Sequence, residues 1–96
     1  MANYYYMWDG KKKSFKSIKS ARSGALKFAK ASGIRALGIY DESNKLVGEL
    51  SYDWNYESGY AFTGFDKNGK YFHKPLYKDG SVGPNRSKSI KEVIKW

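Results

Sequence analysis

The chain has 96 residues, no cysteine and a formal net charge of +9 at pH 7. Its length allows one modest hydrophobic core, and the lack of cysteine excludes disulfides, thiol nucleophiles and cysteine-ligated zinc. Hydrophobic residues make up 41% of the chain and charged residues 28%, which excludes an intrinsically disordered composition. We therefore expect a single globular domain over residues 1–96.

The N-terminal segment "YYYMWDGKKKSF" predicts a β-hairpin. Residues 4–8 have a strong preference for strand structure, and Asp9-Gly10 is a favoured two-residue turn. Residues 11–15 could return as a second strand, and their three adjacent lysines place it at an edge of the sheet or in a loop.

Alternation along the first strand directs Tyr4, Tyr6 and Trp8 to one face, and Tyr5 and Met7 to the other. One set can enter the core, whereas the other must be exposed or covered by a partner. Two interpretations follow. The segment is either a core hairpin with solubilising lysines, or a contact surface that combines aromatic rings with positive charge.

A helix is predicted over about residues 18–31, because apolar side chains recur there at helical spacing. Ser17 is a suitable N-cap, and Gly33 follows the last turn as a C-terminal stop. The apolar face consists of Ile18, Ala21, Ala25, Phe28 and Ala29. The opposite flank carries lysines, so we expect the helix to lie on a sheet with those lysines in solvent.

Four strand-like segments follow the helix, and they read "IRALGIYD", "KLVGELSYDW", "GYAFTGF" and "KYFHKPLY". The second alternates apolar and polar residues, as expected for a strand with one buried face. The next stretch, "KDGSVGPNRSKS", is a loop by composition. Near the end, Ser89 and Glu92 have the spacing of a capping box, which predicts a short helix over about residues 90–96.

This order of elements predicts an α+β fold. We expect a curved antiparallel sheet of about four to six strands, with the main helix packed on it and a short C-terminal helix docked by its own apolar stripe. Folds of this kind serve many functions, so the fold alone does not identify one.

Charge is segregated along the chain. Residues 1–35 carry nine Lys or Arg and one acid, residues 36–66 carry one Lys and six acids, and residues 67–96 carry eight bases and two acids. Such an arrangement favours one positive surface, built from the two ends of the chain, and a separate acidic edge.

The ionisable side chains do not form a recognisable catalytic or metal-binding motif. His73 is the only histidine, and the sequence identifies no partner that would orient it as a general base. The acids are scattered over strands and turns without metal-ligand spacing. We therefore expect no enzymatic activity, no bound metal and no cofactor.

The leading hypothesis is a non-catalytic protein that binds nucleic acid, either DNA or RNA, alone or within a nucleoprotein complex. Basic side chains would contact phosphates, and exposed tyrosines would stack on unpaired bases. The predicted phosphate-contacting residues are Lys11, Lys12, Lys13, Lys16, Lys19, Arg22, Lys27, Lys30, Arg86, Lys88 and Lys91. The stacking candidates are Tyr4, Tyr5 and Tyr6.

The alternative hypothesis is an inhibitor or adaptor, encoded by a phage or mobile element, that binds a host protein or nucleoprotein complex such as a defence nuclease. Many Lys, Tyr, Asn and Ser beside only three Arg indicate an AT-rich genome, such as that of a low-GC bacterium or its phage. The predicted protein-contact edge comprises Asp41, Glu42, Glu49, Asp53 and Glu57. A homodimer through the strand edge of residues 4–8 is a further possibility.

No stretch of the sequence approaches the roughly 20 apolar residues that a membrane-spanning helix requires. The first residues also lack the basic start and the apolar run of a signal peptide. We therefore expect a location in the cytoplasm, which is the host-cell cytoplasm if a phage encodes the protein, and no membrane partner.

Overall fold

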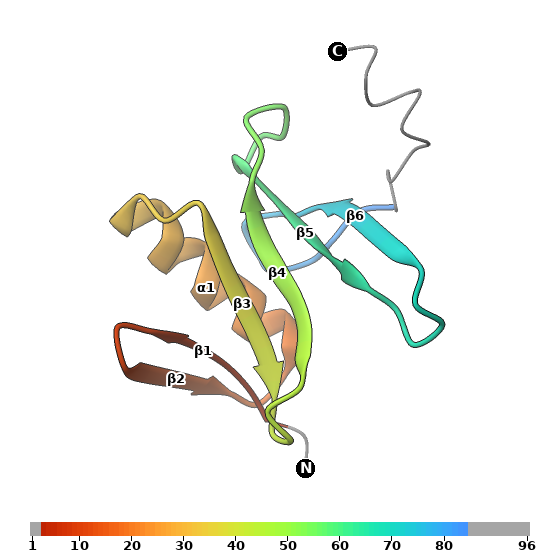
Figure 1. Ribbon diagram of the computed structural model, residues 1–96. Helices are drawn as coiled ribbons and strands as arrows, with labels where there is room; N and C mark the ends of the chain where they lie inside the picture. Colours follow the sequence, from red (N-terminus) through yellow and green to blue (C-terminus); the bar gives the residue numbers. More distant parts are fainter. Residues whose placement is uncertain (1–2, 85–96) are drawn as a thin grey trace.

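A computed structural model describes residues 3–84, in which one helix lies on a curved sheet of six strands (Figure 1). The elements in chain order are β1 (Tyr4–Trp8), β2 (Lys11–Phe15), α1 (Ile18–Ser32), β3 (Ala36–Asp41), β4 (Leu46–Tyr52), β5 (Tyr60–Phe65) and β6 (Tyr71–Pro75). All neighbouring strands are antiparallel, in the order β2-β1-β3-β4-β5-β6. The predicted α+β fold is confirmed. The predicted helix over residues 90–96 lies outside the described residues.

The ends of α1 follow from its capping residues. The Ser17 side chain accepts a hydrogen bond from a backbone N–H of the first turn at 3.1 Å. Gly33 ends the helix in the left-handed conformation, at a φ of 68°. Between these caps, Ala21, Ala25 and Ala29 are fully buried, and their small side chains allow the helix to approach the sheet closely. The observed helix is one residue longer than the predicted one.

The core lies between α1 and one face of the sheet. Ile39 of β3 and Leu50 of β4 are fully buried at its centre. At its margin, the Tyr6 ring of β1 stacks on the Phe28 ring of α1, with 5.2 Å between the ring centroids. The N-terminal hairpin therefore contributes directly to the core.

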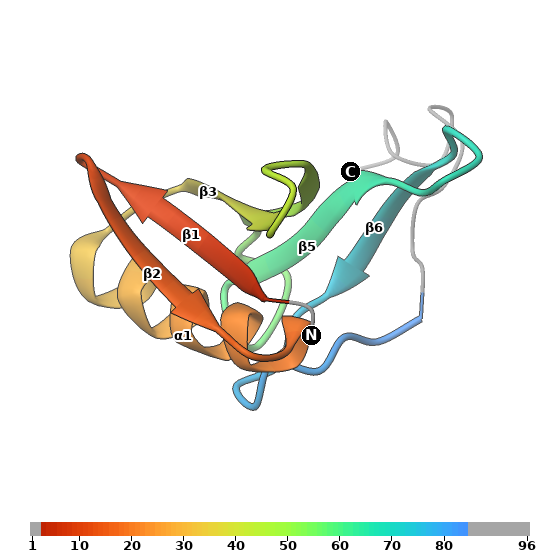
Figure 2. The same ribbon diagram turned by 90° about the horizontal axis from the view of Figure 1, so that it is seen from below.

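The chain after β6 returns to α1 and is tied to it by hydrogen bonds. Arg22 Nε donates to the backbone oxygen of Gly80 at 2.7 Å, and Ser23 Oγ donates to the backbone oxygen of Lys78 at 3.2 Å. The Arg22 guanidinium also lies 5.2 Å from the centre of the Phe62 ring. The predicted loop is a loop in its described part, and it packs against the helix (Figure 2).

The face of the sheet that points away from α1 is also covered at β1. The Tyr5 ring stacks on the Tyr40 ring with 5.3 Å between centroids, and Lys12 Nζ lies 4.2 Å from the Tyr5 ring centre. The Tyr5 hydroxyl donates to Asn44 Oδ1 at 2.7 Å. At Tyr5 and Tyr6, both faces of β1 are therefore buried by the chain's own side chains.

The prediction of a free strand edge at residues 4–8, available for a homodimer, is wrong. Strand β1 pairs with β2 along its whole length and with β3 over Tyr4–Tyr6, so hydrogen-bonded neighbours flank it on both sides. The true edges of the sheet are β2 and β6. The three lysines of β2 lie on one of these edges, where charge disfavours pairing with a second copy of the same strand.

The unfolding free energy should fall as the pH rises above about 10, the ordinary pKa of tyrosine. Burial raises the pKa of the Tyr60 hydroxyl, with a smaller contribution from nearby Tyr52, and burial also raises the pKa of Tyr6. The folded protein thus keeps protons that the unfolded chain releases. Denaturant titrations between about pH 8 and 11 should show this decline. The decline should be shallower in Tyr60→Phe, and an equal slope in both proteins would contradict the assignment.

Candidate nucleic-acid interface

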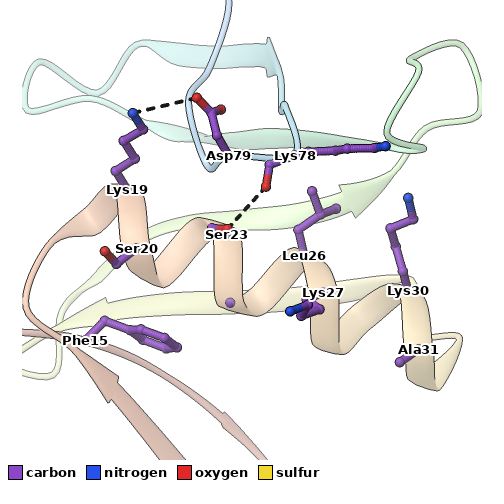
Figure 3. A pocket seen from close by; sticks show the side chains of 11 residues that line it. Phe15, Lys19, Ser20, Ser23, Leu26, Lys27, Lys30, Ala31, Lys78 and Asp79 are labelled. Atoms are coloured by element: carbon purple, nitrogen blue, oxygen red, sulfur yellow. Dashed lines mark hydrogen bonds and ion pairs between the residues drawn. The ribbon is translucent and has the colours of Figure 1, made fainter.

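The outer face of α1 forms one side of an open hollow of about 920 Å³, which we call the α1 groove (Figure 3). Lys19, Lys27 and Lys30 project from this face, because residues three, eight or eleven positions apart lie on one side of a helix. Lys78 joins them from the segment after β6. The groove residues are Phe15, Lys19, Ser20, Ser23, Gly24, Leu26, Lys27, Lys30, Ala31, Lys78 and Asp79.

Small residues form the floor of the α1 groove. Between the lysines, α1 presents Ser20, Ser23, Gly24 and Ala31. Gly24 makes room for the adjacent Phe15 ring, because a Cβ atom at this position would lie only 2.4 Å from Cζ of Phe15 unless that ring shifted. A floor of small side chains lets a bulky ligand approach the helix backbone while the long lysine side chains reach around it.

The α1 groove is strongly positive. It contains four lysines and one acid, Asp79, whose carboxylate lies 3.7 Å from Lys19 Nζ. Both side chains of that pair are well exposed, so it neutralises little of the surrounding charge. Hydrogen bonds from Ser81 hold the pKa of Asp79 below its usual value. Among the described residues, no acid lies within ion-pair distance of Lys27, Lys30 or Lys78.

The other predicted phosphate-contacting residues divide into three groups. Lys11, Lys13 and Lys16 are exposed on or just after β2, which runs beside α1 (Figure 2). Lys12 is exposed too, but it points to the opposite face of the sheet, over Tyr5. Three predicted residues, Arg86, Lys88 and Lys91, lie outside the described residues.

Arg22 does not belong to the positive surface. Its guanidinium is half buried between Gly80 and the Phe62 ring, and burial lowers the pKa of this group. The prediction that Arg22 contacts phosphate is therefore corrected: its hydrogen bond ties the segment after β6 to the helix. Helical spacing alone could not reveal this, because the residues that cover Arg22 are distant in sequence.

The expectation of exposed N-terminal rings is wrong for two of the three tyrosines. Tyr5 and Tyr6 retain only 7% and 8% of their accessible surface, and Tyr4 is partly buried against the core. Because both faces of β1 are covered at Tyr5 and Tyr6, these two rings are not available for stacking on a base. The interpretation of the segment as a core hairpin is therefore correct for Tyr5 and Tyr6, and the lysines of β2 are exposed to solvent.

Other aromatic side chains are exposed. Trp54 retains 75% of its accessible surface and Tyr52 retains 51%, at the end of β4 and just beyond it. The sequence carries a signal for Trp54, since a tryptophan inside the polar stretch "DWNY" has no obvious place in a strand's buried face. The alternation along "KLVGELSYDW", taken to its end, places Trp54 on the apolar face, whereas the observed strand β4 ends at Tyr52.

The five acidic residues proposed as one protein-contact edge do not lie together. Asp41 and Glu42 lie at the β3–β4 turn, whereas Asp53 and Glu57 lie in the β4–β5 connection at the other end of β4. A strand of this length spans roughly 20 Å. Glu49 lies between them, on the face away from α1. Two of these acids bind backbone N–H groups at their turns: Asp41 accepts from Ser43 and Lys45, and Asp53 accepts from Asn55.

His73 has a partner that the sequence did not identify. Its Nε2 lies 3.2 Å from Asp53 Oδ2, and its ring centre lies 5.8 Å from that of Tyr56. Asp53 also accepts two hydrogen bonds from Asn55, so its carboxylate holds the turn after β4. Within residues 3–84, His, Asp and Glu nowhere form a group of three that could hold a metal ion.

No family model matches the chain, and neither the curated proteins nor the solved structures contain a match to it. Between residues 3 and 84, no helix is long and apolar enough to cross a membrane. Function must therefore be inferred from the residues themselves.

Proposed function

We propose that this protein binds nucleic acid without catalysing a reaction on it, and that the α1 groove is the binding site. One observation carries the proposal: four lysines surround a floor of small side chains on the outer face of a helix, with a single acid among them. A phosphate backbone fits this arrangement, because it is a continuous polyanion and each exposed ammonium group can replace a condensed counterion.

The edge strand beside the helix supports the same proposal. Lys11, Lys13 and Lys16 extend the positive charge from α1 along β2, and all three are exposed. The lysines come from three separate parts of the chain, so their convergence on one side is a property of the fold. The acids of the chain lie mostly at turns, among them Asp53 and Glu57 in the β4–β5 connection, and Glu57 lines a small hollow together with Lys78.

The salt dependence of binding tests the proposed function. We expect the unmodified protein to bind fluorescent oligonucleotides with a log–log slope against salt of about −2.8 for a single strand and about −3.6 for a duplex, if four lysines contact phosphates. Fluorescence anisotropy from about 50 to about 300 mM salt is sufficient to measure it. Absence of binding at the lowest salt, or a slope near zero, would show that the α1 groove has another role.

A further inference from the structure

An aromatic surface lies at the end of the sheet where α1 ends (Figure 1). After Gly33 the chain enters β3, and the backbone oxygen of Arg35 accepts a hydrogen bond from the Tyr52 N–H at 2.8 Å. The C-terminal end of α1 and the end of β4 lie at the same end of the sheet (Figure 1). Lys30 lies on the last turn of α1, five residues before Arg35 in the sequence. Arg35 in turn lies beside Tyr52.

The Tyr52 ring is held in place although half of it is exposed. It meets the Tyr60 ring edge-to-face, with 5.8 Å between centroids and an interplanar angle of 84°. Tyr60 is itself anchored, because its hydroxyl donates to the backbone oxygen of Ile34. The Arg35 guanidinium lies 5.7 Å from the Tyr52 ring centre. Tyr52 is therefore an oriented ring with a cation beside it.

Trp54 is a second exposed ring close to Tyr52 along the chain. It lies two residues beyond Tyr52, and its side chain is the most exposed of the large hydrophobic residues described. The turn that carries it is held by Asp53, which accepts hydrogen bonds from the backbone and the side chain of Asn55. Burying a flat indole under a ligand would remove an apolar surface that the folded protein leaves in water. We call Tyr52 and Trp54 the aromatic platform.

We propose that the aromatic platform makes the site selective for single-stranded nucleic acid; this inference rests on the proposed function. The strand's phosphates lie along the α1 groove, and an unpaired base beyond Lys30 stacks on Trp54, with Tyr52 beside it. A base in a duplex already has its ring faces covered by its neighbours, so only a single strand can use the aromatic platform. Exposed rings next to lysines and an arginine are the usual means by which proteins bind unpaired bases.

The test compares a single-stranded oligonucleotide with its duplex at several salt concentrations, using oligodeoxythymidine and oligouridine as separate single strands. Trp54→Ala should weaken single-strand binding roughly 5- to 150-fold and leave duplex binding and the salt slope unchanged. Trp54→Phe, which keeps a ring, should retain most of the affinity. Phe65→Ala is the matched control, because Phe65 is 69% exposed and lies at the opposite end of β5 from Tyr60, the residue that pairs with Tyr52. The two single strands separate DNA from RNA as the preferred ligand.

The outcomes distinguish this inference from the proposed function. If Trp54→Ala binds both forms as tightly as the unmodified protein, or loses affinity equally for both, the aromatic platform is not a stacking site, although the α1 groove can still bind phosphates. If the unmodified protein binds neither form, the proposed function fails as well. A direct readout is available in a variant with Trp8 and Trp96 changed to Phe, since Trp54 is then the only tryptophan. Its fluorescence should be quenched by the single strands and unaffected by the duplex.

Discussion

Replacing Lys27, Lys30 and Lys78 together by glutamine should weaken nucleic-acid binding roughly 50- to 170-fold at about 0.15 M salt. Three phosphate contacts contribute about 2.1 units to the salt slope on a single strand and about 2.7 on a duplex. The expected loss of affinity follows from these slopes if the unmodified protein and the triple variant bind equally at about 1 M salt. Among the described residues, no acid forms an ion pair with any of these three lysines. Anisotropy titrations at several salt concentrations give the affinity and the slope together.

A variant with Lys45, Lys67 and Lys70 changed to glutamine provides the matched control. It loses the same charge, but its substitutions lie near the β3–β4 and β5–β6 turns, away from the α1 groove. Uniform electrostatic attraction would weaken both triple variants alike, and that result would contradict a localised site. If the binding site is the α1 groove, the variant that lacks Lys27, Lys30 and Lys78 should lose much more affinity than the control, and its salt slope should become much shallower. Unfolding curves should be nearly unchanged in both, since all six side chains are exposed or half exposed at the surface.

The helix was predictable from the sequence because its signals are local. Ser17, the run of alanines and Gly33 all act within a few residues of one another, and they place α1 to within one residue. The shared direction of Lys19, Lys27 and Lys30 follows from helical spacing in the same way. The positive face of α1 could therefore be predicted before any tertiary contact was known.

The burial of the N-terminal tyrosines could not be predicted in this way. Alternation correctly separates Tyr5 from Tyr6, but it does not say that β3 pairs with β1 and brings the Tyr40 ring over Tyr5. Lys78 illustrates the same limit. It reaches the α1 groove because Arg22 binds the backbone of Gly80 and Ser23 binds the backbone of Lys78, contacts between residues far apart in the chain. Side chains placed by non-local contacts have no signature in a short window of sequence.

The junction between α1 and the segment after β6 depends on Gly80 having no side chain. A Cβ atom at this position would lie 2.1 Å from the backbone oxygen of Lys19 and 2.9 Å from the backbone nitrogen of Ser23. Gly80 also has a φ of +89°, a conformation that residues with a Cβ rarely adopt. Both conditions would be violated by even the smallest substitution, and the helix backbone cannot move aside as a flexible side chain could.

Gly80→Ala should therefore lower the free energy of unfolding by about 2–5 kcal/mol, as measured by urea denaturation. Gly69→Ala separates the backbone strain at positive φ from the steric contact with α1. Gly69 has a similar φ of +78°, but nothing lies within 4 Å of its Cβ position. This substitution should therefore lower the free energy of unfolding by only about 1–2 kcal/mol. Equal losses in the two variants would mean that the close contact with α1 is unimportant.

Because the displaced segment carries Lys78, Gly80→Ala should also weaken nucleic-acid binding under conditions where it remains folded, whereas Gly69→Ala should not. A substitution of Gly80 is thus expected to lower both stability and binding affinity, since the close contact between Gly80 and α1 stabilises the fold and also positions Lys78 in the α1 groove.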